Sequence, residues 1–235
     1  MRSMVGLCLL LYVGASHAGT LRDDFSDGNS DGWRIAKLLG QGTTWTVEDE
    51  RLVAKSVGAC AWWPNALLIG GDTWRDYSIE VRIMVVEAFP IACQGAGVGG
   101  LVHAADVGAI SLSGLSCFGA SRDPFLNRTL CYTQPLEGDF QLDDDRTFAV
   151  EPNRWYTMRI VAGAKDYRMF GDDVLICETE RQVPDRGAAG LTVRNAEVHF
   201  DDVVITGPNV PDVGLLSVNS TDKAAATWAQ IKRLH

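Results

Sequence analysis

The stretch Asp72-Thr-Trp-Arg-Asp-Tyr-Ser-Ile-Glu-Val-Arg-Ile-Met-Val-Val86 decides the fold. From Tyr77 to Val85 apolar and polar residues alternate with a period of two, which predicts a strand with one buried face. Its β-branched and aromatic residues suit a pleated, half-buried surface. Trp74 and Asp76 precede the strand and are expected to form its entry corner.

Other segments repeat this alternation between turn signals. We expect an edge strand at 21–25 and a polar loop at 143–145. A short helix or tail is expected near the C-terminus, with the helix at 224–232. The remaining expected strands are 43–47, 52–55, 66–69, 75–87, 95–104, 109–113, 129–134, 155–162, 167–170, 174–178, 190–195 and 198–206. So many short strands predict an all-β, antiparallel two-sheet sandwich or barrel.

The N-terminus has the form of an export signal. A basic start precedes an apolar run from Met4 to Val13, which is too short to span a bilayer, and small residues follow up to Ala18. We therefore interpret residues 1–18 as a signal peptide, 19–207 as one domain and 208–235 as a C-terminal tail. The mature protein is expected to be secreted or periplasmic and to lack a membrane span.

Composition limits the partners. The chain of 235 residues has a formal charge of −9. Phosphate binding needs clustered Lys and Arg, so nucleic acid is excluded as the expected partner. Six Cys are present and Cys8 lies in the signal peptide. For the exported chain we predict the disulfides Cys117–Cys131 and Cys60–Cys93, although spacing alone does not fix the connectivity.

Several segments resemble the concanavalin A-like jelly-roll domains of secreted proteins. The opening Asp24-Phe25-Ser26-Asp27-Gly28, the strand from Asp76 to Val81, the segment from Trp155 to Ile160 and the closing segment from Val198 to Val203 are similar to theirs. This superfamily includes laminin-G modules, legume lectins, glucanases and 3-keto-disaccharide hydrolase-type domains. The resemblance implies two stacked antiparallel sheets, adjacent first and last strands, and often a concave face for sugars.

Catalysis has little support in the sequence. The Glu-x-Asp-x-x-Glu motif of retaining glucanases, which places two carboxylates on one strand face, is absent. No catalytic residue can be assigned. Our first hypothesis is a carbohydrate- or surface-binding module without catalysis. The alternatives are a hydrolase of the 3-keto-disaccharide hydrolase type and a protein-interaction module of the laminin-G type.

Sugar binding calls for flat aromatic rings beside hydrogen-bonding side chains. Trp45, Trp74 and Trp155 are interpreted as structural. A calcium ion is expected where the first and last strands meet, with Asp24 and Asp202 as ligands. The candidate carbohydrate-binding residues are Trp62, Trp63, His103, Ser111, Arg122, Tyr132 and Gln134.

Overall fold

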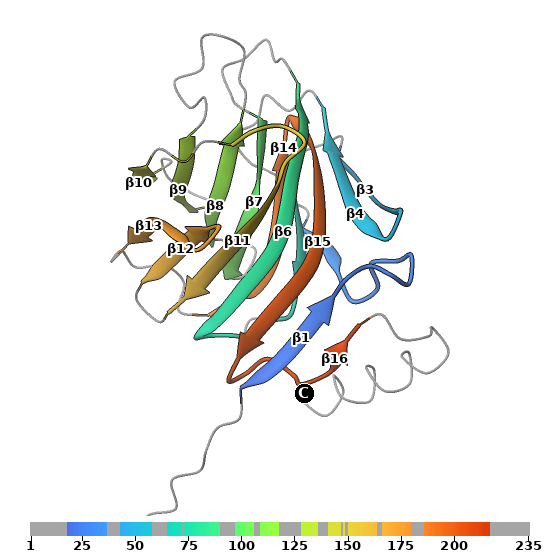
Figure 1. The fold of residues 1–235 in the computed structure, drawn as a ribbon. Coiled ribbons are helices and arrows are strands. Elements are labelled where there is room, and N and C mark those ends of the chain that lie inside the picture. The colour runs from blue at the N-terminus through green and yellow to red at the C-terminus, as the bar shows by residue number, and fades with distance from the viewer. Residues whose placement is uncertain are drawn as a thin grey trace, which may run out of the picture.

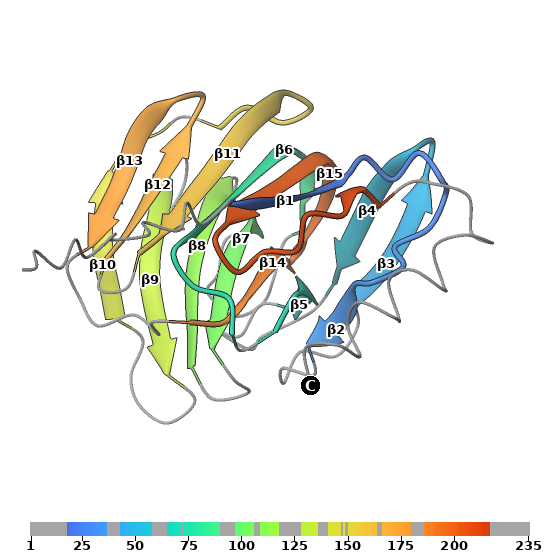
Figure 2. The ribbon, with the colours of Figure 1, turned by 90° about the horizontal axis from the view of Figure 1, so that it is seen from below.

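The computed structural model describes residues 18–36, 43–57, 65–71, 73–89, 97–105, 109–117, 128–135, 141–146, 148, 150–163, 166–179 and 186–216. These residues form two layers of strands (Figures 1 and 2). All their strand pairs are antiparallel except β1–β16, which is parallel. Within the described ranges, no helix is long and apolar enough to cross a membrane.

The first sheet has nine strands in the order β13-β12-β11-β6-β15-β1-β16, and the hairpin β3–β4 is joined to β15. Its strands are β1 (Gly19–Asp23), β3 (Thr43–Glu48), β4 (Arg51–Ser56), β6 (Tyr77–Ala88), β11 (Trp155–Ala162), β12 (Tyr167–Gly171), β13 (Val174–Thr179), β15 (Ala196–Gly207) and β16 (Gly214–Leu215).

The second sheet has seven strands in the order β10-β9-β8-β7-β14-β5-β2. They are β2 (Arg34–Ala36), β5 (Asn65–Ile69), β7 (Gly97–Ala105), β8 (Ala109–Cys117), β9 (Arg128–Pro135), β10 (Gln141–Arg146) and β14 (Ala188–Arg194). Strands β7 to β10 follow one another as a meander.

The core lies between the sheets. Along β6 the residues Ile79, Val81 and Ile83 are fully buried, as the alternation predicted. Leu191 and Val193 of β14 belong to the same cluster from the second sheet. Each such side chain contributes about 1.5–3 kcal/mol through its removal from water.

The predicted entry corner is confirmed. Trp74 is buried and packs edge-on against Tyr77, with ring centroids 6.0 Å apart. Asp76 between them has a φ of 52°, in the left-handed region where Asp is tolerated. The buried hydroxyl of Tyr77 donates a 2.9 Å hydrogen bond to the carbonyl oxygen of Ala188 and so ties the first sheet to the second.

The strands differ from the prediction at four places. The strand predicted as an edge at 21–25 is β1 at Gly19–Asp23, and it lies between β15 and β16. Strand β2 was not predicted, and residues 143–145 lie on β10 rather than in a loop. Strand β16 falls in the predicted tail but pairs with β1, so the first sheet extends beyond residue 207. Short polar strands such as β10 lack the apolar alternation by which strands are identified. The predicted helix at 224–232 and the signal peptide up to residue 17 lie outside the described residues.

The cysteine pairing needs revision. Cys131 on β9 is opposite Ser113 of β8, and Cys117 lies four residues further along β8. That separation is about 13 Å at about 3.3 Å per residue, whereas a disulfide needs Cα atoms within about 7 Å. The Cys117–Cys131 pair therefore does not fit this register. Cys177 on β13, which belongs to neither predicted pair, is buried and disulfide-bonded. Cys60 and Cys93 lie outside the described residues.

Candidate functional site

In the first sheet, the strand that pairs with one side of β15 changes partway along its length. Residues 197–200 of β15 pair with β4, whereas residues 203–207 pair with β1 (Figure 1). Between these two halves the pairing with β6 shifts register, from Asp201 opposite Arg82 to Val204 opposite Glu80. This shift is a β-bulge, which inserts an extra residue and redirects side chains.

The bulge exposes two consecutive carboxylates on the outer face. Asp202 has a φ of 50°, and its N–H donates a 2.8 Å hydrogen bond to Oδ1 of Asp201. The buried alternation resumes immediately afterwards at Val203. The extra residue thus places Asp201 and Asp202 on the same side of the sheet without disturbing the core.

Arg82 of β6 holds this pair of carboxylates. Its Nη1 lies 3.1 Å from Oδ2 of Asp202 and 3.5 Å from Oδ2 of Asp201. Its guanidinium also lies over the ring of Trp155, with Cζ 4.7 Å from the ring centroid. Trp155 begins β11, next to β6 in the sheet. Charge pairing and stacking on an aromatic ring together fix the guanidinium plane.

The end of β1 closes the site from the other side. Asp23 accepts hydrogen bonds from the N–H of Phe25 at 3.0 Å and from Nε1 of Trp33 at 2.8 Å. Phe25, with a φ of 53°, is fully buried against Trp33. Anchored in this way, the loop brings Asp24 beside the bulge.

Two adjoining hollows of about 390 and 370 Å³ lie over this region and share Asp24 and Arg82. Asp202 lines the first hollow. Asp201, Trp155 and Arg51 line the second. We call the two hollows together the bulge groove. Their size lies within the range of small-ligand sites.

The pKa of Asp201 depends on its burial and on the charges around it. Burial raises the pKa of its carboxyl above the ordinary value, and the neighbouring charges of Asp202 and Asp24 act in the same direction. The hydrogen bond from the backbone of Asp202 and the charge of Arg82 lower the pKa, but they do not compensate fully. Burial is the largest of the causes that raise this pKa.

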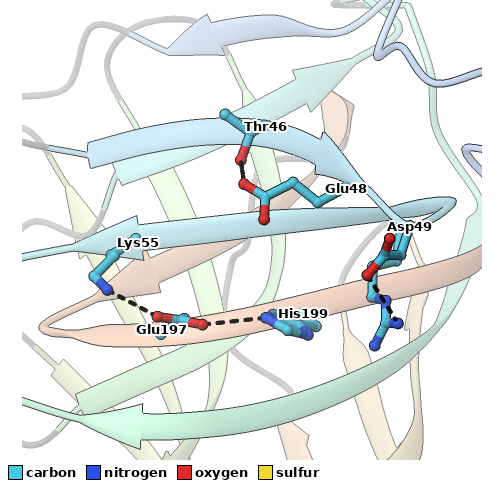
Figure 3. A network of polar contacts seen from close by, with 7 residues as sticks. Thr46, Glu48, Asp49, Lys55, Glu197 and His199 are labelled. Carbon is cyan, nitrogen blue, oxygen red and sulfur yellow. Dashed lines mark hydrogen bonds and ion pairs between the residues drawn. The ribbon is translucent and has the colours of Figure 1, made fainter.

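A second polar network lies along β15 (Figure 3). Nζ of Lys55 donates a 2.9 Å hydrogen bond to Oε2 of Glu197, whose Oε1 is 3.3 Å from Nε2 of His199. Lys55 lowers the pKa of Glu197, and Glu197 in turn raises the pKa of Lys55. Nδ1 of His199 is buried and has no hydrogen-bond partner among the residues that the structure describes.

The predicted sugar-binding residues are only partly placed. Trp62, Trp63 and Arg122 lie outside the described residues. In the second sheet, His103 and Ser111 are directly opposite each other, while Tyr132 is opposite Leu112 and Gln134 is opposite Ile110. Opposite residues share a face and neighbours alternate. The register therefore divides these four between the two faces of the sheet.

The structure adds Trp155, Arg82 and Asp201 to the candidate residues. Trp155 was interpreted as structural, but it is half-buried and lines the groove on the outer face. The signal was present in the sequence, because the alternation that buries Tyr156 and Met158 places Trp155 on the opposite face. The bulge could not be predicted, since the consecutive residues Asp201 and Asp202 do not reveal which residue is the extra one.

The predicted calcium ligands are brought together, since Asp24 and Asp202 line the same hollow. Arg82 pairs with Asp202 at this hollow. In the described part of the chain, no three His, Cys, Asp or Glu side chains gather to hold a metal. Calcium takes six to eight oxygen ligands. The calcium site therefore stays a prediction from the sequence.

No family model and no curated protein matches the chain. The chain does match several solved structures. The carbohydrate-binding module CBM66 from Bacillus subtilis aligns with a TM-score of 0.56 and 20% identity over 74% of this chain and 95% of its own. The carbohydrate recognition domain of Emp47p aligns with a TM-score of 0.53 and 13% identity, over 82% and 98%. Porphyranase B from Zobellia galactanivorans aligns at 0.56 and 9%, over 82% and 94%.

These matches and the two-sheet sandwich define the class of fold. The chain has a concanavalin A-like jelly-roll fold. The adjacent first and last strands that the resemblance implied are confirmed, because β1 pairs with β15 along residues 19–23 and 203–207.

Proposed function

We propose that this chain is an exported carbohydrate-binding module that holds saccharide in the bulge groove without cleaving it. The observation that carries the proposal is the combination of Trp155, Arg82 and Asp201 around one hollow. An aromatic ring supports the apolar face of a sugar, while guanidinium and carboxylate groups bond its hydroxyls.

The similar structures support a carbohydrate ligand. One is named as a carbohydrate-binding module and another as a carbohydrate recognition domain. Both align with most of this chain. Porphyranase B shares the fold as well, so the fold is compatible with both binding and catalysis.

The ion pairs in the groove favour binding over catalysis. A glycosidase needs one carboxyl that is protonated and one that is ionised on opposite sides of the scissile bond. Arg82 contacts both Asp201 and Asp202, so the two carboxylates lie side by side against one guanidinium rather than facing each other across a cleft. Carboxylates held by one guanidinium are suited to accept hydrogen bonds from sugar hydroxyls.

Calorimetric titration of the mature chain with oligosaccharides selected on a glycan array tests the proposal. We expect Trp155→Ala to weaken binding about tenfold, since an aromatic contact contributes about 0.5–1.5 kcal/mol and the apolar area that it buries adds to this. Val174→Ala is the matched control, because Val174 is exposed on β13 at the edge of the sheet. Unchanged affinity in a folded Trp155→Ala protein rules out the groove.

The same titration compares the groove with the aromatic pair predicted from sequence. A double substitution of Trp62 and Trp63 by Ala is expected to leave binding in the groove unchanged. If this variant loses binding while Trp155→Ala keeps it, the sugar site lies at 62–63.

One observation favours a hydrolase as the second candidate function. The raised pKa of Asp201 is what a general acid requires, and Asp202 supplies a carboxylate beside it. In that case the release of reducing ends from a bound polysaccharide should be measurable, and Asp201→Asn should abolish it while binding persists. No release by the unsubstituted chain on the polysaccharides that it binds excludes this alternative.

A further inference from the structure

Three buried polar side-chain atoms lie on the β3–β4 hairpin. They are Oγ1 of Thr43, Nε1 of Trp45 and Oγ of Ser56, and none of them has a hydrogen-bond partner among the residues that the structure describes. Ser56 is completely buried. Buried polar groups in folded proteins are nearly always hydrogen-bonded, so three such atoms on one hairpin require an explanation.

The strand register brings these side chains together on the inner face of the first sheet. Thr43 is directly opposite Ser56, and Trp45 is opposite Ala54. Directly opposite residues have Cβ atoms about 4.5–5.5 Å apart, and diagonal neighbours about 7–8 Å apart remain within reach of an aromatic side chain. Trp45 packs against the core cluster to which Ala54 belongs, so the face that they share is the inner one.

Short side chains surround Ser56 on this face. Ala54 precedes it by two residues on β4. Ala196 of β15 lies beside it, since the next residue along, Glu197, is opposite Lys55. Both alanines belong to the core cluster, and their methyl groups fill little of the roughly 10 Å that separates stacked sheets. The polar atoms thus lie where the core side chains are short, and a water molecule needs only about 10–15 Å³.

The chemistry of the three groups favours water as the bound molecule. An indole N–H only donates, so the bound molecule must accept, which excludes a metal cation. Lys55, the cationic side chain next to Ser56, projects from the opposite face and bonds Glu197, so it does not compensate the charge of an anion at this position. Each hydroxyl can donate or accept, and a buried water makes about three hydrogen bonds.

We propose that the inner face of the β3–β4 hairpin is an internal water site. One water molecule accepts a hydrogen bond from Nε1 of Trp45 and bridges the hydroxyls of Thr43 and Ser56. Among the described strands β3 pairs with β4 alone, so the water adds a side-chain link to the backbone pairing that holds β3 in the sheet. The site is separate from the bulge groove, which lies on the outer face of the same sheet.

Oxygen-17 relaxation dispersion on the mature chain tests the site, because it counts water molecules that tumble with the protein and does not respond to exchanging hydroxyl protons. We expect the wild-type chain to hold one more such water than the double variant Thr43→Val/Ser56→Ala. The double variant offers the water only an indole N–H, whereas a buried water needs two to four polar partners. Equal counts in the two proteins overturn the proposal.

The stability of the single variants gives a second test through its sign. If one water bridges both hydroxyls, Thr43→Val and Ser56→Ala should each lower the folding equilibrium constant about fivefold. Their effects should be less than multiplicative in the double variant, because they remove the same water. If the hydroxyls are unsatisfied, each substitution removes a desolvation penalty and leaves stability unchanged or higher.

Thr44→Val is the matched control for the substitution of threonine by valine. Thr44 is the neighbour of Thr43 on β3, but its side chain is exposed on the opposite face. It should change the folding equilibrium constant by less than about twofold. Urea unfolding of all four variants measures these constants.

The combined outcomes distinguish water from a partner elsewhere in the chain. Loss of one long-lived water together with non-multiplicative losses of stability supports the site. Losses of stability with an unchanged water count mean that the hydroxyls bond a protein group, and they overturn it. Unchanged or increased stability in both single variants overturns it as well.

Discussion

The two faces of the first sheet follow opposite rules. On the inner face, apolar side chains occur at every second position of β6 and β11, and nearly all are fully buried. On the outer face, ion pairs and Arg–aromatic contacts dominate, and β15 is interrupted by a bulge. The inner face determines the fold through uniform packing. The outer face places Trp155, Arg82 and Asp201 around one hollow.

The largest effect expected from this contrast is on the inner face. Phe200→Ala should lower the free energy of unfolding by about 3–5 kcal/mol, because a fully buried aromatic ring leaves a cavity. Phe200 is fully buried and stacks on Trp45, with ring centroids 6.2 Å apart. Urea unfolding followed by tryptophan fluorescence measures the loss. As a control, Val174→Ala at an exposed position should change stability by less than about 0.5 kcal/mol. Equal losses in the two variants would contradict the contrast.

The hydrogen bond that links the two sheets should have the next largest effect on stability. Tyr77→Phe removes the hydroxyl that bonds the carbonyl oxygen of Ala188. We expect a loss of about 1–3 kcal/mol, because a buried carbonyl loses its hydrogen-bond donor. The same urea titration measures it. Wild-type stability in Tyr77→Phe would show that apolar packing alone holds the sheets together at this corner.

The disulfide connectivity provides a test of the strand register at the other edge of the sandwich. Peptide mapping of the unreduced mature protein should place Cys177 in a disulfide and should find no Cys117–Cys131 link, because the register separates those two residues along β8. Strand β13 contacts β9, the strand that carries Cys131. We expect Cys131 to be the partner. A map with a Cys117–Cys131 link would contradict the β8–β9 register.

The sequence predicts the inner face of the first sheet better than its outer face. The inner positions of β6, β11 and β15 were predictable, since a period of two directly reports burial on one side. The strands β2 and β10 were missed because they have no apolar alternation. The groove was missed for a different reason. Its residues come from β1, β4, β6, β11, β15, β16 and adjoining turns, and the order of strands in the sheet brings them together. Asp24 and Asp202 were named in advance, since the resemblance placed the first and last strands side by side.

The smallest expected effect concerns the Lys55–Glu197 pair on the outer face. Glu197→Gln removes the ion pair but keeps the shape of the side chain, and it should lower the urea midpoint only slightly, because surface ion pairs contribute little. The loss should depend on pH in a defined direction. Lys55 lowers the pKa of Glu197, so the stability from this carboxylate is present above its unfolded pKa of about 4.3 and disappears as the pH falls through the folded value. Glu197 raises the pKa of Lys55, so that contribution is present below about pH 10.4 and is lost as the pH rises through the folded value.

The difference between the two proteins should therefore be largest between about pH 5 and pH 10 and should vanish at both extremes. Glu178→Gln, which removes an exposed carboxylate of β13, serves as the control and should show no such window. A difference that grows as the pH falls below about 4 would mean that Glu197 is stabilised in its protonated form, which the 2.9 Å contact with Lys55 opposes. The outer face would then owe its order to packing rather than to charge, and the contrast between the two faces would no longer hold.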